Sequence, residues 1–169
     1  SKTGLPANIL LYSLAIDPKS PTTLYLGVFL STTGGPLIYK STNSGLSWSP
    51  SGTGLPSAQG VFDLAIDPKT PSNLFAAVVV AINANGSVIA NGGVFKSVDS
   101  GGSWQDTTAG IAPVLSTYAG TQYGNITYAG TLTLCSPSQF LISASNLAID
   151  ANTPSTLFAI VDGFVLRTT

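Results

Sequence analysis

The chain has 169 residues and a formal net charge of −1, from six basic and seven acidic side chains. This length suits one ordinary domain that buries a core. The few lysines and arginines are scattered, so we expect neither nucleic-acid binding by counterion release nor attachment to an anionic membrane surface. No apolar run approaches the roughly 20 residues needed to cross a bilayer, so we expect no membrane insertion.

An eight-residue pattern that begins Leu-Ala-Ile-Asp occurs three times, at residues 14–21, 64–71 and 147–154. The apolar residues before each aspartate predict a strand. In the first two copies proline follows the aspartate, and proline ends a strand because it fixes φ and cannot donate a ladder hydrogen bond. A short apolar strand follows each copy. The wider spacing between the second and third copies indicates an inserted segment.

A second octet occurs twice, at residues 41–48 and 97–104, and both copies fit S-x-[DN]-x-G-x-S-W. Asn or Asp at the third position can accept hydrogen bonds from backbone N–H groups, and glycine at the fifth can adopt φ > 0. The octets therefore predict hairpin turns, each followed by a tryptophan that buries its ring. The residues assigned this structural role are Ser41, Asn43, Gly45 and Trp48, and Ser97, Asp99, Gly101 and Trp104.

These octets resemble the Asp-box, or BNR repeat. Together with the Leu-Ala-Ile-Asp segments they resemble the blades of xyloglucan-cleaving hydrolases and sortilin-type receptors. The resemblance covers nearly the whole chain except about residues 107–143. It implies an all-β fold of β-propeller blades, with about three four-stranded antiparallel sheets, the last one incomplete, that stay open or are closed by oligomerisation.

The repeats divide a single β-propeller-like domain, residues 1–169, into four parts. They are blade 1 (1–50), blade 2 (51–106), an inserted β-hairpin (107–143) and an incomplete blade 3 (144–169). Three blades are too few to close a propeller, and an open array exposes strand edges. Three alternatives follow: a fragment of a longer protein, two chains that close a six-bladed ring, or copies that add head to tail into a filament.

The aspartates are expected to be structural. Asp17, Asp67 and Asp150 recur at one repeat position, where a catalytic residue is rarely needed three times. Glycoside hydrolysis requires two carboxyl groups facing one cleft, and Asp63 with Asp106 is a weak candidate pair. Without histidine, a Ser-His-Asp triad is impossible, and zinc lacks its ligands. We therefore expect no catalytic residue, metal or cofactor.

Other side chains suggest contact surfaces. Tyr12 is expected in the core, and Cys135 is expected to be a buried small side chain or an intermolecular disulfide. The tyrosines of the insertion are candidates for a contact surface, against simple packing within the hairpin. They are Tyr118, Tyr123 and Tyr128.

The sequence favours a non-enzymatic extracellular module that assembles with copies of itself into an oligomer or filament. Low charge and open repeat ends suit such a role. One alternative is a fragment of a secreted Asp-box glycoside hydrolase. Another is an adhesin-like propeller that binds glycans or proteins.

Overall fold

The computed structural model of the chain describes residues 2–7, 9–30, 35–57, 60–79, 81–82, 88–90, 92–107, 111–113, 126–128, 132–134, 144–161 and 164–168. Every regular element in these ranges is a β-strand, which confirms the all-β fold. No helix long and apolar enough to span a bilayer occurs among them.

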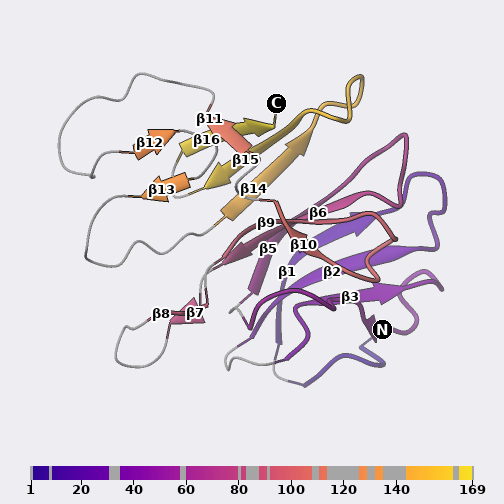
Figure 1. The fold of residues 1–169 in the computed structure, drawn as a ribbon. Helices are drawn as coiled ribbons and strands as arrows, with labels where there is room; N and C mark the ends of the chain where they lie inside the picture. The colour runs from indigo at the N-terminus through magenta and orange to yellow at the C-terminus, as the bar shows by residue number, and fades with distance from the viewer. Residues whose placement is uncertain are drawn as a thin grey trace.

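The larger strands form one eight-stranded and one four-stranded antiparallel sheet (Figure 1). The eight-stranded sheet divides into two halves of four strands each, and we call these halves the first and second sheets and the four-stranded sheet the third. The first sheet contains β1 (Ile9–Ile16), β2 (Leu24–Leu30), β3 (Ile38–Ser41) and β4 (Ser49–Pro50). The second contains β5 (Gly60–Ile66), β6 (Leu74–Val79), β9 (Gly93–Ser97) and β10 (Gln105–Asp106). A single residue pair joins these two sheets, between Phe29 near the end of β2 and Gly60 at the start of β5.

The third sheet differs from the expected one. It contains β14 (Ala144–Ile149), β15 (Leu157–Val161) and β16 (Phe164–Thr168), and β11 (Ile111–Pro113) pairs with the outer edge of β16. Residues 144–169 therefore supply only three strands of this sheet, and β11 adds the fourth. The strand comes from earlier in the chain, from the segment assigned to the insertion, because an exposed β16 edge offers free N–H and C=O groups to any nearby extended segment.

Two short hairpins lie outside the three sheets. β7 (Ala81–Ile82) pairs with β8 (Val88–Ala90) between β6 and β9. β12 (Ile126–Tyr128) pairs with β13 (Leu132–Leu134) within the insertion. Within the insertion, β12 and β13 thus form a hairpin of two paired strands.

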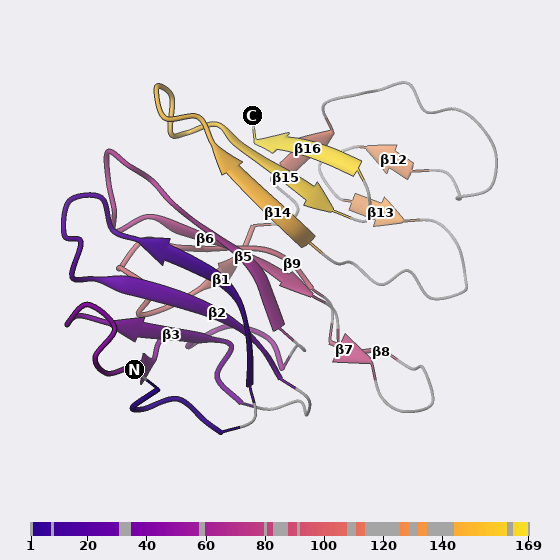
Figure 2. The same ribbon diagram turned by 180° about the vertical axis from the view of Figure 1, so that it is seen from behind.

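The three sheets lie one after another, with the second between the first and the third (Figure 2). Two apolar clusters fill the spaces between them. One includes Tyr25 and Ile38 of the first sheet and Val61 and Leu64 of the second. The other joins Phe75 and Val94 of the second sheet to residues of the third, chiefly Ala144, Leu157 and Leu166. Side chains alternate across a strand, so the second sheet buries both of its faces.

The segment after each outer strand packs against the octet of the following sheet, and glycine makes this close approach possible. Gly54 has φ +90°, and a Cβ atom there would lie 2.4 Å from the carbonyl oxygen of Trp104. The Trp104 N–H donates to the Thr53 carbonyl at 2.9 Å. Gly4 and Trp48 repeat this arrangement at the first octet, with φ +87° at Gly4.

Gly54→Ala is expected to destabilise the protein by roughly 1–3 kcal/mol, because alanine is strained at positive φ and its methyl group meets backbone. Chemical denaturation of both proteins measures the difference. Gly52→Ala is the control, since its Cβ would meet no atom nearer than the Leu55 methyl at 3.3 Å. Equal stability of the two variants would contradict this explanation.

Candidate functional site

The two octets form turns with the same hydrogen bonds. In the first, the Ser41 hydroxyl accepts from the N–H of Gly45 at 2.9 Å, and Asn43 Oδ1 accepts from the N–H of Ser47 at 2.9 Å. Ser44 and Gly45 have positive φ angles of 58° and 80°. This conformation strains a non-glycine residue, and the side-chain acceptors hold it in place.

In the second octet the third residue is charged. Asp99 Oδ1 accepts from the N–H of Ser103 at 2.9 Å and Oδ2 accepts from its hydroxyl at 2.7 Å, while the Ser97 hydroxyl donates to Oδ1 at 2.7 Å. The hydroxyl and N–H of Ser103, followed by the hydroxyl of Ser97, lower the pKa of Asp99 to about 2. These donors favour the carboxylate over the protonated acid.

The second octet also binds the first sheet. Its Ser100 carbonyl accepts from the Tyr25 hydroxyl and from Lys40 Nζ, each at 3.0 Å. The Gly101 carbonyl accepts from the Ser51 hydroxyl at 2.7 Å. The carbonyl groups of two residues with positive φ thus act as acceptors for the neighbouring sheet. The buried rings of Trp48 and Trp104 lie at the base of the two octets, 8% and 3% exposed.

The three repeated aspartates close the turns between the first and second strands of each sheet. Asp17, Asp67 and Asp150 each accept, through Oδ1, the backbone N–H groups two and three residues later. Burial of Asp67 opposes its ionisation, but the N–H groups of Thr70 and Lys69 outweigh burial, and the pKa of Asp67 lies below its ordinary value.

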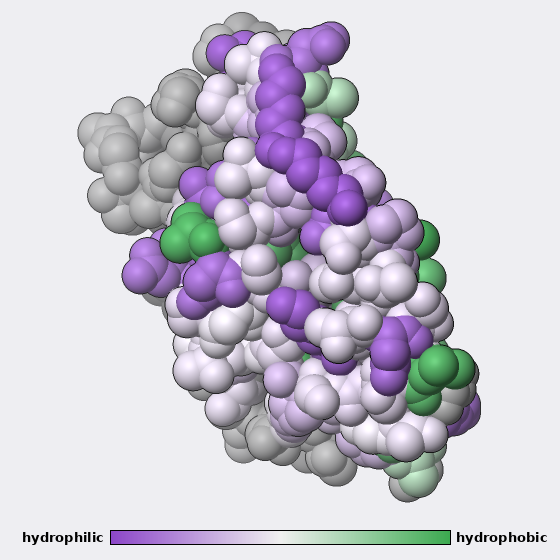
Figure 3. Space-filling view, turned by 90° about the vertical axis from the view of Figure 1, so that its right-hand side faces the viewer, coloured by the Kyte–Doolittle hydropathy of each residue, from purple (hydrophilic) through white to green (hydrophobic). Residues whose placement is uncertain are grey.

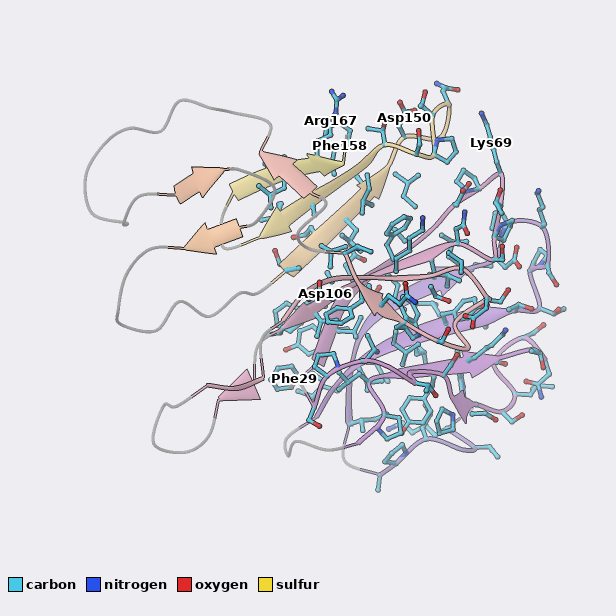
Figure 4. The ribbon with its side chains drawn as sticks, viewed as in Figure 1. Phe29, Lys69, Asp106, Asp150, Phe158 and Arg167 are labelled. Atoms are coloured by element: carbon cyan, nitrogen blue, oxygen red, sulfur yellow. The ribbon has the colours of Figure 1, made fainter. Side chains whose placement is uncertain are left out.

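Lysine side chains link these turns from sheet to sheet. Lys19 Nζ donates to the Lys69 carbonyl, and Lys69 Nζ donates to the Asn152 carbonyl at 2.6 Å. Figure 4 places Lys69 and Asp150 together at one end of the sheets. Seen from this side, the surface is mainly hydrophilic or neutral, with hydrophobic residues in a few separate places (Figure 3). Hydrogen bonds thus link the turns of successive sheets at this end.

Asp63 of β5 connects the first strands of all three sheets, which are β1, β5 and β14. Its Oδ1 accepts from the Ser13 hydroxyl of β1 at 3.2 Å, and its Oδ2 accepts from the Leu147 N–H of β14 at 2.9 Å. Asp63 lies on β5 and Asp106 lies on β10, and β6 and β9 separate these two strands, so the two residues are three strand spacings apart. At about 4.8 Å per strand the two carboxylates are roughly 14 Å apart, whereas glycosidase carboxylates lie roughly 5–10 Å apart. Asp63 and Asp106 are thus not a catalytic pair.

An aromatic cluster joins residues of β1, β2 and β5. Tyr12 stacks on Phe62 with ring centroids 4.8 Å apart and an interplanar angle of 9°, and Phe29 flanks both rings at 5.6 and 6.0 Å. Tyr12 is 51% exposed, so the prediction that it is a core residue is wrong. It lies at a β-bulge between Leu11 and Ser13, which changes the side of the strand that later side chains face.

Several predicted contact residues lie outside the described ranges, namely Tyr118, Tyr123 and Cys135. Of Tyr128 only the backbone, in β12, is described. In the described part of the chain, no three side chains of histidine, cysteine, aspartate or glutamate are grouped to hold a metal ion. The sequence missed the Tyr12–Phe62 stack, although both residues stand two positions before the Leu-Ala-Ile-Asp pattern, which was a usable signal.

The fold is similar to that of an ancestral GH74 enzyme, whose crystal structure matches 89% of this chain with a TM-score of 0.51 and 18% sequence identity. The match covers 16% of that protein, so the chain spans about a sixth of its length. At this identity the similarity establishes the propeller-type fold alone.

Two other solved structures are also similar. They are the GH74 enzyme of Niastella koreensis (14% identity, 90% of this chain, 26% of that one, TM-score 0.46) and the GH74 xyloglucanase of Xanthomonas campestris (16%, 88%, 26%, 0.41). No protein-family model matches the sequence, and no curated protein matches it.

The comparison corrects the expectation that the chain is not an enzyme. That expectation rested on aspartates that recur at one repeat position, on the absence of histidine, on low charge and on open repeat ends. A solved structure that shares the fold at a TM-score above 0.5 is an enzyme, so this fold gives no argument against catalysis.

The two octets predict a difference in acid sensitivity. The pKa of Asp99, about 2, is below its unfolded value of about 3.9, so its stabilising effect is present above pH 4 and is lost as the pH falls towards 2. Asp99→Asn should preserve the turn, as Asn43 does, and should weaken the fall in melting temperature between pH 5 and 2. Asn43→Asp should steepen it. Identical pH profiles for wild type and both variants would contradict the assignment.

Asp63→Ala is expected to lower the free energy of unfolding by roughly 1–3 kcal/mol, because it leaves the Ser13 hydroxyl and the Leu147 N–H without their acceptor. Asp63→Asn retains one carbonyl oxygen and should cost less. Urea denaturation of the three proteins measures this order. A stability of Asp63→Ala equal to wild type would show that the carboxylate does not hold the inner strands together.

Proposed function

We propose that this chain supplies blades to an extracellular propeller of the glycoside hydrolase type, and that its part in that protein is to hold a polysaccharide. The similarity to the ancestral GH74 enzyme supports the class of protein. The exposed Tyr12 ring, stacked on Phe62, is the observation that supports binding. The proposal assigns no catalytic carboxylate to the described residues.

The aromatic cluster has the properties of a sugar-binding platform. The Tyr12 ring is fixed from beneath by Phe62 and from the side by Phe29, so little conformational freedom remains to be lost on binding. Its exposed half offers a flat apolar surface with a polar hydroxyl at the rim. Pyranose rings carry apolar C–H faces and hydroxyl edges, which such a surface complements.

The position of the cluster supports the same role. Figure 4 shows Phe29 at the end of the sheets from which the β7–β8 hairpin projects, away from the end that carries Lys69 and Asp150. The bonded turns between first and second strands occupy the far end. A polymer that lies across the free end would therefore meet the aromatic cluster without disturbing the turns.

In this proposal the two octets are Asp-boxes with a purely structural role. The hydrogen bonds of Ser100 and Gly101 to the first sheet support it, because they fix the spacing of adjacent sheets. Asn43 replaces the acid in the first octet with no loss of the turn, which agrees with a role in folding and not in chemistry.

Tyr12→Ala is expected to weaken binding to soluble xyloglucan about tenfold or more, since loss of an aromatic contact costs about 1.4 kcal/mol. Affinity electrophoresis in xyloglucan-containing gels, followed by isothermal titration calorimetry, measures this effect. Tyr12→Phe retains the ring and should bind within a few-fold of wild type. Melting temperatures of all three proteins establish that the fold is retained.

The proposal fails if the wild type migrates as fast with xyloglucan as without it. It also fails if Tyr12→Ala is retarded as strongly as wild type, because binding would then occur elsewhere on the molecule.

A further inference from the structure

The outer faces of the first and third sheets expose residues whose repeat equivalents are buried between sheets. Leu11 and Leu14 of β1 are 51% and 57% exposed, while their equivalents in β5, Val61 and Leu64, are 0% and 7% exposed. Ile16 is 53% exposed. We name these three residues of β1 the front face. The front face is apolar, and its repeat-equivalent positions in the second sheet pack against the first sheet.

The third sheet shows the matching half of this interface. Val165 of β16 is 48% exposed, whereas Val94 and Ile38, at the same position of the second and first sheets, are both 0% exposed. Ala148 is exposed too, although its equivalent Ala15 is 9% exposed. We name Ala148 and Val165, with Phe158 of the same sheet, the back face.

The two junctions within the chain show how these faces fit together. Back-face positions of the first sheet, Tyr25 and Ile38, share one apolar cluster with front-face positions of the second, Val61 and Leu64. In the next junction Phe75 and Val94 share a cluster with Ala144, and Leu147 packs against it. At both junctions, front-face positions of one sheet pack against back-face positions of the sheet before it.

Polar groups at the junction follow the same order. Lys40 stands opposite Tyr25 in the register of β2 and β3, and its Nζ donates to the Ser100 carbonyl of the following octet. In the third sheet Arg167 stands opposite Phe158 (Figure 4). The third sheet therefore carries on its back face the same pair of an aromatic ring and a cation that, in the first sheet, contacts the octet of the following sheet.

We propose that the front face of this chain binds the back face of a second copy, so that copies join head to tail through a third junction like the two within the chain. The chain itself contains both halves of this interface, which is why a second copy is the occupant that fits it. Such a contact is heterologous, and it generates a ring or an open array according to the rotation per copy. With the proposed function it shares only the premise that these sheets belong to a larger propeller.

Two charge substitutions test the two halves separately. Wild type should show a concentration-dependent mass of at least twice the 17.2 kDa of the chain by sedimentation equilibrium. Leu14→Asp on the front face and Val165→Asp on the back face should each remain at 17.2 kDa. Because both side chains are half-exposed in the single chain, the melting temperatures at low concentration should stay near that of wild type.

A mixture of the two variants tests directly whether the front face of one copy binds the back face of another. Leu14→Asp retains an intact back face and Val165→Asp an intact front face, so an equimolar mixture should form a dimer that neither protein forms alone. Val98→Asp is the matched control. Val98 is 63% exposed although its octet is docked against the first sheet, so this variant should associate as wild type does.

A monomeric wild type at all concentrations overturns the proposal, as does a mixture that stays monomeric, or a Val98→Asp variant that dissociates like the other two. Failure here leaves xyloglucan retardation and its dependence on Tyr12 unaffected, so the two proposals fail by different measurements.

Discussion

The structure depends on the burial of sheet faces against one another. A four-stranded sheet of this kind is apolar on both sides, because the side chains of its central strands alternate between two neighbours. Leu74 and Phe75 are adjacent in β6, and they enter different clusters on opposite faces. No sheet can therefore bury its core alone, and the stability of each is a property of its junctions, as in repeat proteins generally.

The charged residues serve these junctions. The chain has only seven acids, and the described ones at the turns act as fixed acceptors of backbone N–H groups. A carboxylate that accepts several such bonds is stabilised in its ionised form, which explains the lowered pKa values of Asp67 and Asp99. The lysines complete the arrangement, since Lys19 and Lys69 donate to carbonyl groups of the following turn. The charged side chains of the aspartates therefore fix the turns within sheets, and those of the lysines link the turns of neighbouring sheets.

The features that could be predicted from the sequence are those that are local and repeated. The strand ending at Ile66 and the strand at Gly93–Ser97 follow from apolar runs bounded by proline or a tight turn, and the octets follow from their spacing. What escaped prediction involves single, non-repeated contacts. Asp63 was considered together with Asp106 as a weak catalytic pair, because its actual partners, Ser13 and Leu147, lie 50 and 84 residues away. Tyr12 was placed in the core because an apolar run does not reveal a bulge. The pairing of β11 with β16 joins segments whose sequences carry no common pattern.

The two ends of the sheets differ in a way that bears on function. Each connection between first and second strands has the same length and the same aspartate-closed turn, at residues 17–23, 67–73 and 150–156. The connections between second and third strands vary instead, and they occupy residues 31–37, 80–92 and 162–163. Uniform turns that bond to their neighbours suit a framework, and variable loops on a rigid scaffold are where binding residues concentrate. The Tyr12–Phe62 stack lies towards the variable end, beside Phe29 near the end of β2. None of the three rings of this cluster belongs to the front face or the back face, so recognition and assembly use different residues of the same blades.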